Sequence, residues 1–365
     1  MIPRVDQLRA KMTELGLPAM LVTKFEHVLY LSGFCGSGPT ELEAVLIITP
    51  DRQLLITDFR YVLQAEAEAP GWELVQVEER LTTTVRQVLR DLGLPAIGFE
   101  PEALSVAVYQ QLGGEEADLP YRLVPAPGLI EALRLVKDPD ELALIRQAVQ
   151  LTDLAYQRIV SIAKPGVTER DLALEAEWVM RQHGAEGVAF DIIVAAGEHS
   201  ALPHAKTGPR PLQPGDLVVV DMGARYAHYC ADMTRTFAVV EANAKAREIY
   251  RLCYEAQTTG TRQIRAGMTG READQIVRDV IARGGYGDYF GHGTGHGVGL
   301  EIHEAPRVSR FYAGELPVGT LITIEPGIYC PGIGGVRIED LCLLTAAGVE
   351  ILTRAEKPAE LPIYG

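Results

Sequence analysis

The stretch VVVDMGARYAHYCADMTRTF, residues 218–237, decides the fold of the larger part of the chain. Its two ends are rich in β-branched residues, which predicts two strands of an antiparallel hairpin. A tight turn at Tyr226 and Ala227 would place Asp221 directly opposite Asp232. Two bare carboxylates so close together repel each other and raise each other's pKa unless a cation neutralises them. We therefore expect this hairpin to hold a metal ion.

A second hairpin repeats this arrangement in TIEPGIYCPGIGGVRIED, residues 323–340. Two apolar runs flank a loop rich in proline and glycine that is centred near Gly332. This symmetry places Glu325 and Glu339 side by side on neighbouring strands. The sequence thus predicts a second pair of carboxylates that needs a cation.

Histidines concentrate in the run HGTGHGVGLEIHE, residues 292–304. The run is too rich in glycine for a helix and lacks the H-E-x-x-H spacing of a zinc-binding helix, but its glycines let the backbone approach a site closely. We expect His296 to join the four carboxylates as a ligand. Such a hard donor set suits two divalent ions, with Mn, Co or Fe preferred and Zn possible. A single aspartate could be a turn residue and a single histidine could be structural, so the prediction rests on their joint occurrence.

These motifs closely resemble those of the pita-bread metalloexopeptidases, in particular the proline-specific branch of Xaa-Pro dipeptidases (prolidases) and Xaa-Pro aminopeptidases. The resemblance covers nearly the whole chain. It implies an α+β protein whose C-terminal pita-bread domain has a curved antiparallel sheet and outer helices, preceded by a smaller creatinase-like α/β domain. It also implies a dinuclear metal centre with five ligands: Asp221, Asp232, His296, Glu325 and Glu339.

The resemblance implies further roles around the metals. His303 is expected to donate a hydrogen bond to the tetrahedral oxyanion or to shuttle a proton, and Glu325 to act as general base as well as ligand. His204, in SALPHAKTG, is expected to contact the substrate and to belong with them to the catalytic set. His292 is expected to bind substrate. Imidazole suits proton transfer near neutral pH.

Two arginines are expected to bind substrate. Arg337 precedes Glu339 by two residues and so points to the same face of a strand, where it could steady that carboxylate or contact the substrate. Arg307, in HEAPRVSR, resembles the arginine that captures the free carboxylate of a dipeptide, although a solvated surface arginine is the alternative. Bidentate recognition of this kind favours a substrate that ends at that carboxylate. The sequence therefore favours a dipeptidase.

Other functions remain as alternatives. The nearest is an Xaa-Pro aminopeptidase that acts on longer peptides. A methionine aminopeptidase is less favoured, because those enzymes usually lack such an amino-terminal domain. A non-catalytic binding protein and metal-free, creatinase-like hydrolysis are disfavoured by the presence of all five ligands. The expected partner is a proline-containing di- or oligopeptide, and the resemblance also implies a homodimer.

Composition limits the possible partners and location. A net charge of −15 disfavours binding to nucleic acid, which depends on neutralising phosphates with Lys and Arg. No apolar run reaches the ~18 residues of a membrane span, and the amino-terminal residues lack a signal-peptide core. The 5 cysteines are odd in number and widely spaced, which argues against a disulfide framework. We therefore expect a cytoplasmic protein that does not associate with membranes.

A length of 365 residues predicts about two domains. Residues 1–127 alternate helix and strand patterns, as in an α/β layer domain, and residues 128–365 form the predicted catalytic domain. A helix start signal near the boundary consists of Asp138, Pro139 and Glu141. Residues 166–184 and 267–285 each read as a turn, a capped helix and a terminal glycine. This internal repeat predicts two related halves with helices outside and the sheet inside.

Overall fold

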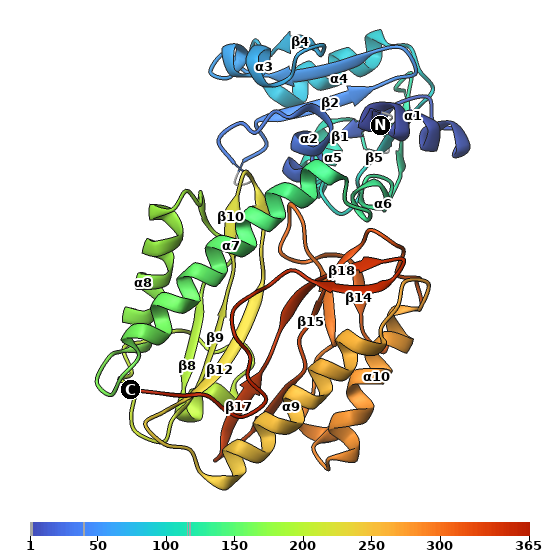
Figure 1. Ribbon diagram of the computed structural model, residues 1–365. Coiled ribbons are helices and arrows are strands. Elements are labelled where there is room, and N and C mark those ends of the chain that lie inside the picture. The colour runs from blue at the N-terminus through green and yellow to red at the C-terminus, as the bar shows by residue number, and fades with distance from the viewer. Residues whose placement is uncertain (1–2, 39–40, 115, 117) are drawn as a thin grey trace. The chain divides into compact units, whose positions relative to one another are not determined.

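The computed structural model describes residues 3–38, 41–114, 116 and 118–365, and the chain divides into the units Met1–Leu133 and Arg134–Gly365 (Figure 1). The predicted boundary after residue 127 stays a prediction. No helix in the described part of the chain is long and apolar enough to cross a membrane. No disulfide links any of the five cysteines, all of which are described.

The first unit is built on a six-stranded sheet in the order β4-β3-β2-β1-β5-β6. β1, β5 and β6 run parallel to one another, whereas β2 is antiparallel to β1 and β3. The strands are β1 (Met20–Val22), β2 (Ala44–Ile48), β3 (Gln53–Thr57), β4 (Glu73–Gln76), β5 (Ala96–Phe99) and β6 (Arg122–Pro125). The helices are α1 (Arg4–Glu14), α2 (Phe25–Ser32), α3 (Val62–Glu68), α4 (Leu81–Asp91), α5 (Val106–Gln111) and α6 (Glu131–Arg134).

The predicted alternation of helices and strands in this unit is confirmed, but the sequence patterns did not indicate α2, α4, α5 or β6. In α4 the signal was weak because threonines, whose β-branched side chains lower helix propensity, fill its first turn. Only Val85 and Leu89, four residues apart, are buried within it. The formation of this helix therefore depends on the packing of its narrow apolar face against the rest of the unit.

Four long helices lie on the outside of the second unit (Figure 1): α7 (Pro139–Ile162), α8 (Glu169–Gln182), α9 (Ala244–Gln263) and α10 (Gly270–Arg283). The predicted start of α7 is confirmed, since Asp138 and Glu141 form a reciprocal capping box. α8 and α10 are each 14 residues long and begin after a threonine capping box, at Thr168 and Thr269. The internal repeat predicted from the sequence is thus present in the structure as two helices of equal length with the same kind of cap.

The strands of the second unit are mostly antiparallel and form several small sheets, the largest in the order β20-β12-β9-β8. Their bounds are β7 (Gly187–Val188), β8 (Ile193–Ala196), β9 (Leu217–Met222), β10 (Ala224–Tyr226), β11 (Tyr229–Cys230), β12 (Met233–Val239), β13 (Gly295–Gly297), β14 (Glu304–Val308), β15 (Leu321–Ile324), β16 (Gly327–Cys330), β17 (Gly334–Arg337), β18 (Asp340–Thr345), β19 (Gly348–Ile351) and β20 (Ile363–Tyr364). Two short 3-10 helices are η1 (Gly197–Ala201) and η2 (Gly287–Tyr289).

Two hydrophobic cores divide the second unit along the repeat. In the first, α7 and α8 pack on β8, β9 and β12, with Leu172 and Val220 fully buried. In the second, α9 and α10 pack on β15 to β18, with Val277 and Ile324 fully buried. The strands that carry the predicted ligands are therefore supported by helices from both halves.

The first predicted hairpin forms, but its register was wrong. The turn lies at Ala227 and His228, whose φ angles are +46° and +68°, one residue later than predicted. Asp221 therefore faces Thr234, and Asp232 is offset from it by two residues. Positive φ at both central positions is usually marked by Asn-Gly or Asp-Gly, and Ala-His gives no such signal. Residues two apart on a strand share a face, so both carboxylates still reach one site.

The second predicted hairpin is confirmed. β15 pairs with β18 so that Ile324 faces Asp340, and β16 pairs with β17 so that Gly327 faces Arg337. Because the two strand pairings share one register, Glu325 lies opposite Glu339 between them. Gly332 lies in the turn with a φ of +78°. The prediction succeeded because the loop is marked by glycine and proline on both sides.

Asp340, which follows Glu339, lies at the centre of a buried polar cluster. Its carboxylate accepts hydrogen bonds from Arg235 and Gln257 at 2.8 Å and contacts Lys357. Burial works to raise the pKa of Asp340, but the charges of Arg235 and Lys357 outweigh it and lower that pKa to about 2. Arg235 also donates to the backbone carbonyl of Glu339. The cluster therefore supports the strand that presents Glu339.

Asp340→Asn is expected to lower the free energy of unfolding by about 3–5 kcal/mol at pH 7, because it leaves buried cations without their anion. The pKa of Asp340 is lower in the folded state, so its ionised form stabilises the wild type above about pH 4 and this contribution is lost as the pH falls towards 2. Urea unfolding at pH 7 and pH 3 measures the effect. The difference in the free energy of unfolding between variant and wild type should be smaller at pH 3 than at pH 7. An equal difference at the two pH values would contradict this account.

Candidate metal centre

All the site residues predicted from the sequence line one cavity of about 310 Å³ in the second unit. They come from segments that are far apart in the chain. Most of them lie on or next to the two hairpins and the strands β13 and β14. These lining residues are Asp221, Asp232, His296, Glu325, Glu339, His204, His292, His303, Arg307 and Arg337. The cavity thus collects four carboxylates, four imidazoles and two guanidinium groups.

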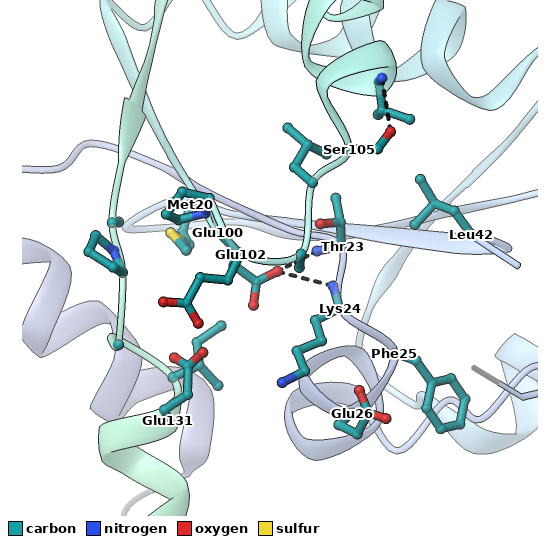
Figure 2. A pocket seen from close by; sticks show the side chains of 18 of the residues that line it. Met20, Thr23, Lys24, Phe25, Glu26, Leu42, Glu100, Glu102, Ser105 and Glu131 are labelled. Atoms are coloured by element: carbon teal, nitrogen blue, oxygen red, sulfur yellow. Dashed lines mark hydrogen bonds between the residues drawn. The ribbon is translucent and has the colours of Figure 1, made fainter. Parts of the chain in front are cut away.

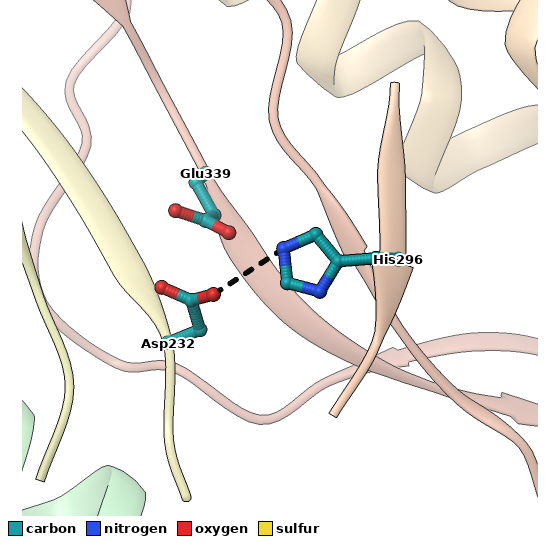
Figure 3. Close-up of side chains that lie close together, drawn as sticks. All are labelled: Asp232, His296 and Glu339. Carbon is teal, nitrogen blue, oxygen red and sulfur yellow. Dashed lines mark ion pairs between the residues drawn. The ribbon is translucent and has the colours of Figure 1, made fainter. Parts of the chain in front are cut away.

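Asp232, His296 and Glu339 form the tightest group of potential metal ligands (Figure 3). Each offers one ligand atom, and these atoms lie within 4.8 Å of one another. His296 Nε2 lies 3.5 Å from Asp232 Oδ2 and 3.2 Å from Glu325 Oε1. All three residues of the group are buried. An imidazole nitrogen and carboxylate oxygens at this spacing suit a divalent cation.

Two carboxylate oxygens in this site have no partner among the residues that the structure describes. Oδ1 of Asp221 and Oε1 of Glu339 are buried and accept no hydrogen bond from the described residues. Leaving a buried charged acceptor unsatisfied is costly, and buried charges are usually paired or coordinate metals. The donor set present therefore fits a divalent metal.

The ionisation of the carboxylates supports the same conclusion. Burial and the nearby charges of Glu339, Asp221 and Glu325 raise the pKa of Asp232 well above its usual range. Burial and the charges of Glu325 and Asp221 do the same to the pKa of Glu339. Without a cation these groups would take up protons, whereas a bound cation would hold them ionised.

Glu325 differs from its neighbours. Burial works to raise its pKa, but the hydrogen bond and charge of His296, with smaller contributions from His292 and Arg337, lower that pKa to about 2. Thr323 Oγ1 also donates to Glu325 Oε1 at 3.0 Å. Glu325 is therefore ionised at neutral pH and oriented by a neighbour two residues earlier in the chain.

Two threonine hydroxyls orient the ligands, and the sequence analysis missed both. Thr323 Oγ1 accepts from the backbone N–H of His296 at 3.0 Å and so joins His296 to Glu325. Thr234 Oγ1 donates to Glu339 Oε2 at 2.8 Å. Partners of this kind fix ligand geometry. The available signal was the alternation T-I-E at the end of β15 and just beyond it, which places Thr323 and Glu325 on one face.

Glycines allow the strands of the site to approach closely. A Cβ on Gly295 would lie 2.0 Å from the carbonyl oxygen of Thr323, and one on Gly223 would lie 1.8 Å from that of Ala231. Gly295 lies in the glycine-rich run next to His296, and Gly223 lies two residues after Asp221. The close backbone approach predicted for the histidine run is confirmed at Gly295.

Arg337 contacts a different carboxylate from the one suggested by the sequence. Its Nη2 lies 2.5 Å from Asp221 Oδ2, its Nε donates to Thr234 Oγ1 at 3.0 Å and its Nη1 donates to the Tyr329 hydroxyl at 2.8 Å. Arg337 and Glu339 line the same cavity and both bond to Thr234, as their two-residue spacing suggested, but the guanidinium pairs with Asp221. Arg337 is buried and holds Asp221, so its placement favours a role in orienting that carboxylate over direct substrate contact.

His292 is held by protein groups on both sides of its ring. Nδ1 contacts the carbonyl of Gly293 at 2.8 Å, and Nε2 contacts the hydroxyl of Tyr329 at 3.0 Å. Burial lowers the pKa of His292. Tyr329 is thus a further residue of the cavity wall that links His292 to Arg337.

His204, His303 and Arg307 are exposed on the open side of the cavity. The ring of His303 packs edge-on to that of His296, with centroids 4.3 Å apart. Burial of part of this ring and the charges of His296 and Arg307 lower the pKa of His303 to about 4. Arg307 lies directly across from His296 in the pairing of β13 with β14, so both occupy the same face. These three side chains are accessible to a substrate.

A second cavity, of about 390 Å³, lies in the first unit where β1, β5 and β6 end (Figure 2). Glu100 accepts hydrogen bonds from the backbone nitrogens of Thr23 and Lys24 at 2.7 and 3.1 Å, and its other oxygen contacts buried His27. The described residues of its lining include no histidine or cysteine. It is larger than the cavity that collects the predicted ligands, so the choice of metal centre rests on donor chemistry and not on size.

The larger of the two units gathers four carboxylates and four imidazoles in one cavity. Two of the carboxylate oxygens are buried without a partner among the described residues. These features are those of a metallohydrolase. The family model of metallopeptidase family M24 matches residues 143–346, and that of the creatinase/prolidase N-terminal domain matches residues 4–136. The chain belongs to metallopeptidase family M24. Membership implies a divalent-metal cofactor, and the predicted family and pita-bread fold are confirmed.

Several relatives match over nearly their whole length. An Xaa-Pro dipeptidase of Pyrococcus furiosus is 36% identical, with 97% of this chain and 98% of the relative covered. The solved structure of an Xaa-Pro dipeptidase from Bacillus anthracis superposes with a TM-score of 0.93 at 42% identity, covering 99% of both chains. That of an X-Pro aminopeptidase from Thermotoga maritima gives a TM-score of 0.88 at 35% identity, covering 98% of this chain and 99% of the other.

Proposed function

We propose that the protein is a metal-dependent exopeptidase that hydrolyses the peptide bond before proline in Xaa-Pro dipeptides. The observation that carries the proposal is the single cavity that joins the five predicted ligands to three further histidines and to Arg307. The similarity to two Xaa-Pro dipeptidases over nearly the whole chain supports the same substrate class.

The cofactor we propose is a pair of divalent ions held by the five ligands: Asp221, Asp232, His296, Glu325 and Glu339. Four ionised carboxylates balance the formal charge of two divalent ions, and the buried oxygens of Asp221 and Glu339 that lack a partner among the described residues are available as donors. The donor set favours Mn, Co or Fe, with Zn possible through the imidazole. When bound, such a pair supplies Lewis acidity and an activated water molecule for amide hydrolysis.

The protein groups then have distinct tasks. Glu325 is ionised and can accept a proton as general base. His303 is neutral at pH 7, so its ring N–H can donate a hydrogen bond to the oxygen of the scissile carbonyl as negative charge develops there. His204, at the exposed side of the cavity, is placed to contact the substrate. Arg337 orients Asp221, and His292 lines the cavity, where it can contact the substrate.

Arg307 determines which length of substrate the enzyme prefers. It is exposed, and it faces the same side of the β13–β14 pair as the proposed ligand His296. A guanidinium there can bind the carboxylate of a two-residue substrate whose scissile bond lies over the metals. In a tripeptide the carboxylate lies one residue further away, so the same contact would be lost.

Arg307→Ala is therefore expected to raise KM for Ala-Pro about tenfold to a hundredfold, because a charge-assisted hydrogen bond contributes about 1.5–3 kcal/mol. The wild type should prefer Ala-Pro over Ala-Pro-Ala by a similar factor. Steady-state kinetics of both proteins on both peptides, with Mn and with Co, measures this. Equal efficiency on the two peptides, unchanged in Arg307→Ala, would reject the dipeptidase and favour the aminopeptidase.

A homodimer and a cytoplasmic location complete the proposal. The dimer rests on the family resemblance, and the location on the odd number and wide spacing of the cysteines. Sedimentation of the purified protein tests the first, and fractionation of the source cells tests the second.

A further inference from the structure

Four charged side chains form a cluster that we call the charge clamp: Arg134, Lys137, Glu301 and Glu304. Lys137 Nζ lies 2.5 Å from Glu304 Oε1, and Arg134 contacts the other oxygen of Glu304. Arg134 Nη1 donates to Glu301 Oε2 at 3.0 Å. The side chain of Glu304 is only 7% exposed and that of Lys137 only 1%. Two cations thus meet two anions, as the burial of charge requires.

The charge clamp closes the loop of residues 299–304. The guanidinium of Arg134 holds Glu301 and Glu304 together, and the carbonyl of Gly299 accepts from the backbone N–H of Cys230 at 2.8 Å. A Cβ on Gly299 would lie 2.4 Å from Glu304 Oε1, so the carboxylate rests against the backbone of its own loop. The loop is therefore fixed at its beginning, middle and end.

His303 belongs to this loop and makes few contacts of its own. No residue that the structure describes forms a hydrogen bond with its ring, although the ring packs on His296. His303 lies in a bend just before β14 begins at Glu304, and His303 lines the cavity whereas Glu304 does not. The side chain of Glu304 thus enters the charge clamp, whereas that of His303 faces the cavity. The orientation of His303 therefore depends on the backbone that Glu304 anchors.

We propose that Glu304 is a positioning residue for His303 and that Arg134 and Lys137 are its anchors. The kinetic part of this inference rests on the proposed function. A misplacement of about 1 Å in a catalytic group can cost roughly a hundredfold in rate. Glu304 does not line the cavity and so has no direct contact with the substrate.

The first test is Glu304→Gln in the metal-loaded enzyme. We expect kcat on Ala-Pro to fall about tenfold to a hundredfold, with KM within about twofold and metal content unchanged. Glu350→Gln is the matched control, because it removes a surface ion pair with Arg146 and should leave kcat unchanged. An unchanged kcat in Glu304→Gln would overturn the proposal.

Glu304→Gln leaves an excess of buried positive charge and could lower stability for that reason alone. The double variant Glu304→Gln/Lys137→Met removes one charge of each sign, so it should recover the melting temperature but keep the low kcat. Recovery of kcat together with stability would overturn the positioning role and leave a purely structural one.

A double-mutant cycle tests whether the effect passes through His303. In a His303→Ala background, adding Glu304→Gln should lower kcat less than about twofold, because residues that act through one another are not additive. Losses that multiply would overturn the proposal.

An NMR measurement decides the point without any substrate. In Zn-loaded enzyme labelled with 13C at histidine Cε1, the His303 resonance is assigned by its loss in His303→Ala. We expect that resonance to shift or broaden in Glu304→Gln/Lys137→Met, and an unaltered resonance would overturn the proposal. If the wild type hydrolyses no Xaa-Pro dipeptide, the proposed function fails, while this measurement still decides the role of Glu304.

Discussion

Glu339→Gln is expected to remove nearly all hydrolytic activity while leaving the metal-free protein at least as stable as the wild type. Changing a residue that only supports a ligand typically costs about 10–100-fold in metal affinity or activity, and losing a ligand should cost more. Burial and neighbouring carboxylates raise the pKa of Glu339, so its ionised form is unfavourable without a cation. A neutral amide of the same shape removes that repulsion.

The measurement is paired: Ala-Pro hydrolysis with metal present, and melting temperature with and without metal. Added metal should raise the melting temperature of the wild type, because it binds the folded state, and should do so less in Glu339→Gln. Glu350→Gln, on the surface, is the control for both. A metal-free Glu339→Gln protein that melts well below the wild type, or one that keeps full activity, would show that Glu339 is a structural carboxylate.

His303→Ala is expected to lower kcat on Ala-Pro about 10²–10³-fold with little change in KM. A donor that serves mainly the developing oxyanion acts in the transition state, and removing one such donor typically costs this much. His303 is exposed and makes no hydrogen bond to any described residue, so the variant should fold normally.

Steady-state kinetics separates this role from simple binding. An unchanged kcat with a raised KM would reassign His303 to substrate binding. His183→Ala serves as the control, because His183 ends α8 and does not line the cavity.

The site residues could be predicted from the sequence because each lies in a short motif with its own backbone signal. Gly332 marked the second hairpin, and the register it implied for Glu325 and Glu339 is the register of the structure. The capping residues Thr168 and Thr269 marked the internal repeat in the same way. Such local signals survive folding because the backbone conformation they specify is the one observed.

The rest depended on contacts between distant segments. The Ala227–His228 turn carries no glycine or asparagine, so the register of Asp221 could not be read from its residues. Arg337 reaches Asp221 across the sheet instead of Glu339 beside it in sequence. Thr234 acts through Glu339, more than a hundred residues away. The charge clamp likewise joins Arg134 to Glu304, which no spacing within one segment indicates.

The most direct test of the account is a metal titration of the purified apoprotein. Mn or Co is added in steps after treatment with a chelator, and Ala-Pro hydrolysis is followed at each ratio of metal to chain. The account predicts no hydrolysis at the start and a rise that saturates near two ions per chain. Full hydrolysis by the chelated protein, or no hydrolysis of Ala-Pro at any metal ratio, would contradict it.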